Sequence, residues 1–97
     1  MDAVHDAAKK GNVVFRPSSE RDSRNLGYFG DESTEVLVSL RDDDFHRTED
    51  YSHGEVAKKC DVYLPTVEND QGSFDELYIK IQLHSGWLIV HSFHLQR

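Results

Sequence analysis

The stretch DELYIKIQLHSGWLIVHSFHL, Asp75–Leu95, decides the fold of this chain. Its first half alternates apolar and polar residues, a period of two that is typical of a half-buried strand. Ser85-Gly86 then favours a two-residue turn, and the apolar run WLIV returns. The stretch therefore predicts an antiparallel hairpin with strands at 75–84 and 87–95. The residues expected on its core face in the first strand are Leu77, Ile79, Ile81 and Leu83.

Pairing the two strands about this turn predicts Leu83 opposite Leu88 and Ile81 opposite Val90, with both pairs pointing to the core. If the second strand continued regularly, its next apolar residue, Phe93, would face solvent. A histidine would replace it in the core, which is unfavourable because a buried imidazole needs a partner. A regular strand is therefore a poor reading of the segment HSFH.

A β-bulge at His91–Ser92 resolves this conflict. One extra residue at that point lets Val90 and Phe93 face the core together. It also turns His94 to the polar face, opposite Tyr78. The sequence thus predicts a bulge in the second strand of the hairpin.

The N-terminal half of the chain is expected to form helices joined by loops. DAVHDAAKKG (2–11) is rich in alanine and lysine and ends at a glycine, as does SSERDSRNLG (18–27). The second segment offers Ser18 or Ser19 as its N-cap. STEVLVSLRDDDF (33–45) fits both a strand and a helix, and its Ser33 and Thr34, as N-caps, favour the helix.

The C-terminal half is expected to form strands. KCDVYLPTV (59–67) is the first, ENDQGS (68–73) is a loop, and the hairpin follows. Helices early and strands late predict an α+β fold, with N-terminal helices packed on one face of a small antiparallel β-sheet.

The composition describes a single domain over residues 1–97. Of its 97 residues, 37% are apolar and 30% are charged, as in soluble globular proteins. The one cysteine, Cys60, excludes an internal disulfide and fits a reducing cytoplasm. No apolar run approaches the roughly 20 residues that cross a bilayer, and the N-terminus lacks the order of a signal peptide. We therefore expect a cytoplasmic protein with no membrane partner.

The histidines do not form a metal-binding pattern. His91 and His94 lie three residues apart, and such residues point to opposite faces of a regular strand. CxxC and HExxH motifs are also missing from the sequence. We expect no metal site and no cofactor.

Four segments occur in a familiar order: SLRDDDFHRTEDYS, DVYLP, LYIKI and LIVHSF. Together, over roughly residues 11 to 97, they resemble the MqsR (motility quorum-sensing regulator) toxin family of bacterial toxin–antitoxin systems. The resemblance implies a RelE-like fold and a metal-independent mRNA endoribonuclease, or mRNA interferase. The substrate of this enzyme would be single-stranded mRNA. A cognate antitoxin would bind the enzyme in a toxin–antitoxin hetero-oligomer.

The resemblance also implies site residues. Three residues are candidates for catalysis because they occupy positions of the family pattern. The family's basic residue after Asp-Phe corresponds to Arg47, and its tyrosine in Tyr-x-Lys-Ile corresponds to Tyr78. Its final lysine corresponds to His94. In-line attack of a ribose 2′-OH on the adjacent phosphate needs a base, an acid and a cation, and a guanidinium can clamp the phosphate. The candidate RNA contacts are Lys80, His84 and Cys60.

The chain departs from the family pattern at two of these positions. His94 replaces a lysine, and an imidazole transfers protons near neutral pH where a lysine supplies charge. Cys60 replaces a glutamine and cannot donate as a carboxamide does. The chain is also acidic, with a net charge of −7, whereas nucleic-acid binding usually uses a basic face.

Three readings of function therefore stay open. The first is the endoribonuclease. The second is a catalytically weakened RelE-like protein-binding module that acts through an antitoxin-like partner, which the negative charge favours. The third is a small-molecule or metal-binding domain that uses the histidines.

Overall fold

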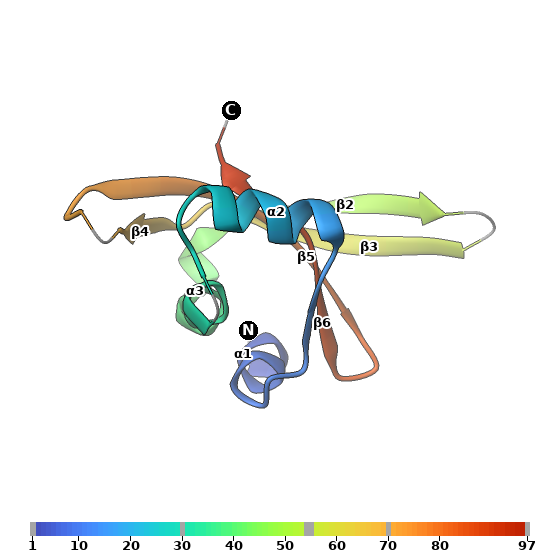
Figure 1. Cartoon of the computed structure of the whole chain (residues 1–97). Coiled ribbons are helices and arrows are strands. Elements are labelled where there is room, and N and C mark those ends of the chain that lie inside the picture. The colour runs from blue at the N-terminus through green and yellow to red at the C-terminus, as the bar shows by residue number, and fades with distance from the viewer. Residues whose placement is uncertain (1, 30, 54–55, 70, 97) are drawn as a thin grey trace.

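The computed structural model contains three helices and a mixed sheet, which confirms the α+β class (Figure 1). It describes residues 2–29, 31–53, 56–69 and 71–96. The helices are α1 (Asp2–Lys9), α2 (Pro17–Asn25) and α3 (Asp31–Ser39), followed by a short 3₁₀ turn at Asp42–Asp44. The strands are β1 (Val13–Phe15), β2 (Phe45–His53), β3 (Val56–Tyr63), β4 (Thr66–Glu68), β5 (Phe74–His84) and β6 (Trp87–Leu95).

The sheet is mixed, so the prediction of an antiparallel sheet is wrong at one edge. Its order is β1-β6-β5-β3-β2, with β4 paired to β5 outside this path. β1 runs parallel to β6, and Val13 pairs with Leu88. The other pairs are antiparallel. At three residues, β1 is too short to show a period of two, which is why the sequence pattern did not reveal it.

The central hairpin of β5 and β6 has the predicted turn and the predicted bulge. Ser85 and Gly86 both have positive φ, 50° and 77°, as a type I′ turn requires. The ladder passes from the pair Ile81–Val90 directly to Lys80–Ser92, so one residue of β6 is extra. The extra residue is His91.

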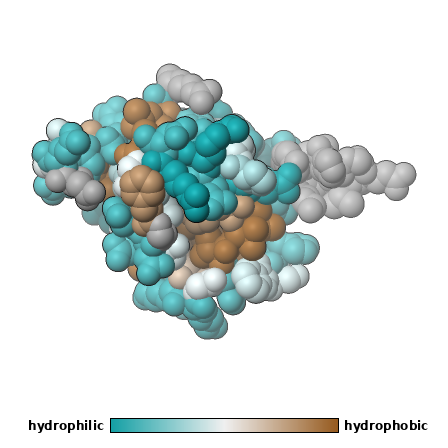
Figure 2. All heavy atoms as spheres, viewed as in Figure 1, coloured by the Kyte–Doolittle hydropathy of each residue, from teal (hydrophilic) through white to brown (hydrophobic). Residues whose placement is uncertain are grey.

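The core lies between the helices and one face of the sheet. Phe93 is fully buried, and its ring packs edge-on against Tyr28 at a centroid distance of 5.5 Å. The other fully buried hairpin residues are Leu77, Ile79, Leu88 and Val90. Seen from the helix side, hydrophilic side chains cover the outer surfaces of the helices, and apolar side chains show between α1 and α2 (Figure 2).

Two hairpin residues depart from the expected alternation of burial. Leu83 faces Leu88 as predicted, but it is 43% exposed because it lies next to the turn at the end of the hairpin. Gln82 is only 7% exposed, and its side-chain oxygen lies 3.0 Å from His91 Nε2. The bulge residue thus supplies a hydrogen-bond partner for a buried amide.

Both predicted glycine stops end their helices. Gly11 and Gly27 have φ of 76° and 97°, a region that glycine enters without a steric penalty. After α1, the Gly11 and Asn12 N–H groups donate to carbonyl oxygens of the last turn, and Gly27 and Tyr28 do the same after α2. Both ends are therefore Schellman motifs.

The predicted N-caps are wrong. α2 begins at Pro17, one residue before Ser18, because proline is well suited to the first helical position. Ser19 is instead fully buried, with its Oγ 2.8 Å from the carbonyl oxygens of Arg16 and Val90. α3 begins at Asp31, before Ser33 and Thr34, although the preference for a helix in this segment is confirmed.

Strand β2 was missed, and the strand predicted at 59–67 is split. β2 lies at the edge of the sheet opposite β1, and its exposed polar residues hide the alternation that buried strands show. β3 ends at Tyr63 and β4 begins at Thr66. Pro65 lies between them, and it has no N–H to donate to a ladder.

Candidate functional site

Five polar side chains gather on the face of the sheet opposite the helices. Tyr78 and Lys80 alternate along β5 with buried core residues, so they lie on this open face. Cross-strand pairing brings His94 of β6 beside Tyr78. It also places Arg47 of β2 in the same row as Lys80, with Val62 between them. We call the set Arg47, Glu49, Tyr78, Lys80 and His94 the polar cluster.

Glu49 is the centre of the polar cluster. Its Oε1 accepts hydrogen bonds from Arg47 Nε, at 2.9 Å, and Arg47 Nη2, and it lies 3.5 Å from the Tyr78 hydroxyl. Its Oε2 lies 3.4 Å from Lys80 Nζ. The Glu49 side chain therefore reaches from β2 across β3 to β5.

Two buried residues of β3 form the floor beneath this bridge. Cys60 pairs with Glu49, and Val62 pairs with Arg47 on one side and Lys80 on the other. Both β3 side chains are fully buried. The open face is thus a solvated polar layer on a small apolar floor.

The charged groups of the cluster stabilise one another's ionised forms. The hydrogen bond from Arg47, supported by Lys80, lowers the pKa of Glu49, although partial burial opposes the shift. The same carboxylate raises the pKa of Arg47. Glu49 is therefore ionised at neutral pH and is flanked by two cations.

Tyr78 and His94 form a stacked pair. Their ring centroids are 4.9 Å apart, and the planes are nearly parallel at 5°. His94 Nδ1 lies 2.7 Å from the carbonyl oxygen of Leu95. A carbonyl only accepts, so Nδ1 carries a proton and donates it to this bond. The stack and the hydrogen bond together fix the orientation of the imidazole.

The structure brings together four of the six residues singled out from the sequence. Arg47, Tyr78, Lys80 and His94 belong to the cluster. The Cys60 thiol lies in its buried floor rather than on its surface.

His84 lies outside the cluster. It pairs with Trp87 at the turn of the hairpin. It is six residues from Tyr78 along β5, about 20 Å at the rise of a strand. Its distance from the cluster makes it a useful control.

Sequence reasoning missed Glu49, the residue that joins the others. Glu49 follows Arg47 by two positions, so a strand there would place both on one face. That signal becomes readable only when 45–53 is recognised as a strand. Five acidic residues near Arg47 made Glu49 look like one surface charge among several.

Among the described residues, no group of three or more His, Cys, Asp or Glu side chains is arranged to hold a metal ion. In the same part of the chain, no helix is long and apolar enough to cross a membrane. Comparisons of the sequence with models of known protein families and with curated proteins find no match.

Proposed function

We propose that the chain is a metal-independent endoribonuclease of single-stranded RNA, the toxin of a type II toxin–antitoxin pair with a RelE-like fold. One observation carries the proposal. Side chains that the family resemblance selected from separate segments, Arg47, Tyr78 and His94, meet on one open face around an ionised carboxylate. The hairpin register alone brings His94 beside Tyr78, so the support comes from Arg47, which reaches the same face from the separate strand β2.

The cations of the cluster can bind a phosphate without breaking their present contacts. A guanidinium has five N–H donors. Arg47 uses two of them on Glu49 and also interacts with the Tyr78 hydroxyl, so at least two are left. The Lys80 ammonium has three donors and directs one of them toward Glu49. Together they can stabilise the extra negative charge of a pentacovalent phosphorus.

Proton transfer in this proposal uses Glu49 and His94. The Glu49 carboxylate takes the proton of the ribose 2′-OH as its oxygen attacks the adjacent phosphorus. The imidazolium of His94 gives a proton to the 5′ oxygen as the bond from phosphorus to that oxygen breaks. The products are a 2′,3′-cyclic phosphate and a free 5′-hydroxyl. Tyr78 positions the imidazole by stacking on it.

The decisive experiment measures cleavage of a labelled single-stranded RNA by purified protein. Tyr78→Ala and His94→Ala are each expected to abolish detectable cleavage, a loss of at least about 10²–10⁴-fold, since they disturb a proton-transfer group. His84→Ala is the matched control, because it removes a histidine from the same sheet outside the cluster. Its rate should equal that of the wild type. Cleavage should also persist in EDTA.

Unchanged cleavage in both Tyr78→Ala and His94→Ala would refute the site, provided that circular dichroism shows both variants folded. Equal losses in His84→Ala and His94→Ala would show that the effect is not specific to the cluster.

A second candidate function is a RelE-like protein-binding module without cleavage. The net charge of −7 favours it, because a polyanionic substrate is repelled by an acidic protein. Wild-type protein that fails to cut any RNA but binds the product of an adjacent antitoxin-like gene would support this candidate over the enzyme. Both functions place the protein in the cytoplasm with an antitoxin-like partner.

A further inference from the structure

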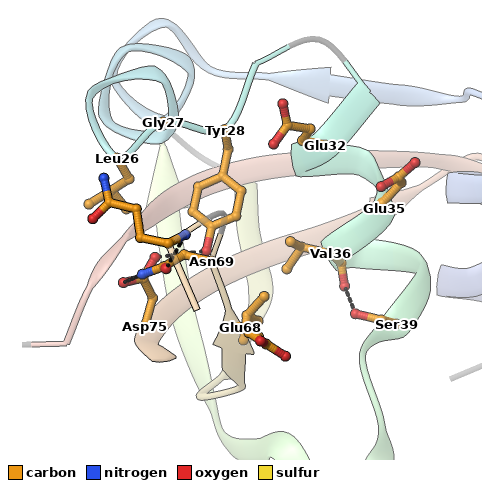
Figure 3. Close-up of a pocket in the computed structure, with 12 residues that line it drawn as sticks. Leu26, Gly27, Tyr28, Glu32, Glu35, Val36, Ser39, Glu68, Asn69 and Asp75 are labelled. Atoms are coloured by element: carbon orange, nitrogen blue, oxygen red, sulfur yellow. Dashed lines mark hydrogen bonds between the residues drawn. The ribbon is translucent and has the colours of Figure 1, made fainter. Parts of the chain in front are cut away.

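A groove of about 430 Å³ lies on the helix side of the molecule, away from the polar cluster (Figure 3). One wall is α3, and the other is formed by β4, the loop after it and the start of β5. The segment that follows α2 closes one end. Asp75 lies two positions before the buried Leu77, so both are on the helix-facing side of β5. The groove and the polar cluster are therefore on opposite faces of the sheet.

The inner part of the groove is apolar. Tyr28 and Val36 are 7% and 5% exposed, and Leu26 and Val67 are half-buried beside them. One large apolar side chain that is next in the chain to a lining residue is exposed. It is Phe29, 59% exposed, which directly follows the lining residue Tyr28 in the chain. Aromatic residues are enriched on surfaces that a partner covers.

The charge of the groove has a single sign. Its lining includes four carboxylates and neither lysine nor arginine: Glu32, Glu35, Glu68 and Asp75. None of the four forms an ion pair within the described part of the chain. The polar cluster differs in this respect, because there the carboxylate is neutralised by Arg47 and Lys80.

One of the four carboxylates is held in a fixed position. Asp75 Oδ2 accepts a hydrogen bond from the Tyr28 hydroxyl at 2.9 Å, and Oδ1 accepts one from Asn69 Nδ2 at 3.1 Å (Figure 3). Both donors are neutral, so the negative charge stays uncompensated. An anion that is already held in position costs less conformational entropy to bind a cation than a mobile side chain does.

We propose that this groove binds a basic, amphipathic segment of a protein partner, with Lys or Arg side chains on the carboxylates and an aliphatic side chain on the floor. The charge complementarity selects a cationic partner. The apolar floor, with the exposed ring of Phe29, selects a peptide over a small hydrated polyamine, which would leave the apolar surface uncovered. This site does not rest on RNA cleavage, so either proposal can fail while the other stands.

The test uses fluorescence anisotropy with the full chain and a fluorescein-labelled nine-residue peptide of alternating arginine and leucine. The test variant is Glu32→Gln, Glu35→Gln and Glu68→Gln together. The control variant is Asp42→Asn, Asp43→Asn and Asp50→Asn, three exposed carboxylates outside the groove. Both change the net charge of −7 by the same three units, so general electrostatic attraction is matched.

The groove variant is expected to bind the peptide about tenfold more weakly than the wild type, and the control within about twofold, since each exposed ion pair contributes modestly. A second peptide with serine in place of leucine should also bind about tenfold more weakly. Equal losses in the two protein variants would overturn the proposal. Displacement of the probe by spermine as effective as that by unlabelled arginine–leucine peptide would also overturn it, because the groove would then bind charge alone.

Discussion

Deletion of His91 is expected to leave the sheet intact, although it removes a residue from the middle of its central hairpin. The ladder between β5 and β6 passes from Val90 to Ser92 and skips His91. Joining Val90 directly to Ser92 turns the bulge into a regular strand. Phe93 then keeps its place opposite Ile79 in the core. The register on both sides of the deletion is unchanged.

The expected cost includes the loss of a hydrogen bond to a buried side chain. His91 Nε2 lies 3.0 Å from the side-chain oxygen of Gln82, which is only 7% exposed. A buried polar group that loses its partner costs about 1–3 kcal/mol. A loss of about 2 kcal/mol lowers the Tm of a domain this size by about 8–16 °C.

The matched control is deletion of Ile89. It shortens β6 by the same amount and also keeps Phe93 opposite Ile79, but it moves His91 into the position of Val90, which is fully buried. The Val90 side chain moves to the half-buried position of Ile89 and loses part of its burial, up to about 1.5 kcal/mol. An imidazole enters the core at a further cost of about 1–3 kcal/mol. The total approaches the whole stability of a small domain.

The assay is urea unfolding, followed by the fluorescence of Trp87, the only tryptophan, and by far-UV circular dichroism. Deletion of His91 should give a cooperative transition at moderately lower urea, and deletion of Ile89 should give little or none. If the two deletions were equally unstable, the reasoning about the bulge would be refuted, because both remove one residue and only the core position differs.

Two further predictions concern single side chains. The folded-state pKa of Glu49 lies below its unfolded value, so its stabilising contribution is present above about pH 4.5 and is lost as the pH falls through the folded value. Glu49→Gln should therefore unfold at slightly lower urea than the wild type at pH 7, and the gap should close as the pH falls through the folded-state pKa of Glu49. A gap that is constant with pH would contradict this. Cys60 is fully buried, so Ellman's reagent should modify it at least about 100-fold more slowly in the native protein than in urea, whereas fast native labelling would show that the floor of the polar cluster is open.

The hairpin could be predicted in detail because its side chains alternate in a pattern that only one register satisfies. Ile81, Val90 and Phe93 cannot all face the core without a bulge, and the structure has that bulge. The glycine stops at Gly11 and Gly27 could be predicted for a similar local reason. A left-handed residue after a helix is almost always glycine.

The parts that could not be predicted depend on distant contacts. β1 is a strand only because β6 pairs with it, and Ser19 is buried only because it contacts the Val90 carbonyl of that same strand. The sequence around the three residues of β1, or around Ser19, contains no sign of these distant contacts. The polar cluster shows the same limit, since the centre, Glu49, depends on the unrecognised strand β2.

The parallel pairing of β1 with β6 also bears on the order in which the chain folds. Val13 meets Leu88, so closing this pair brings together two points near opposite ends of the described chain. Closing a loop of that length costs conformational entropy before the paired strands gain any stabilising contact, so non-local pairing slows folding. The N-terminal segment therefore has no sheet to join until the β5–β6 hairpin exists. We expect the hairpin to form first, as the template, and the N-terminal segment to dock on it late, with amide protons of β1 that exchange sooner than those of β5.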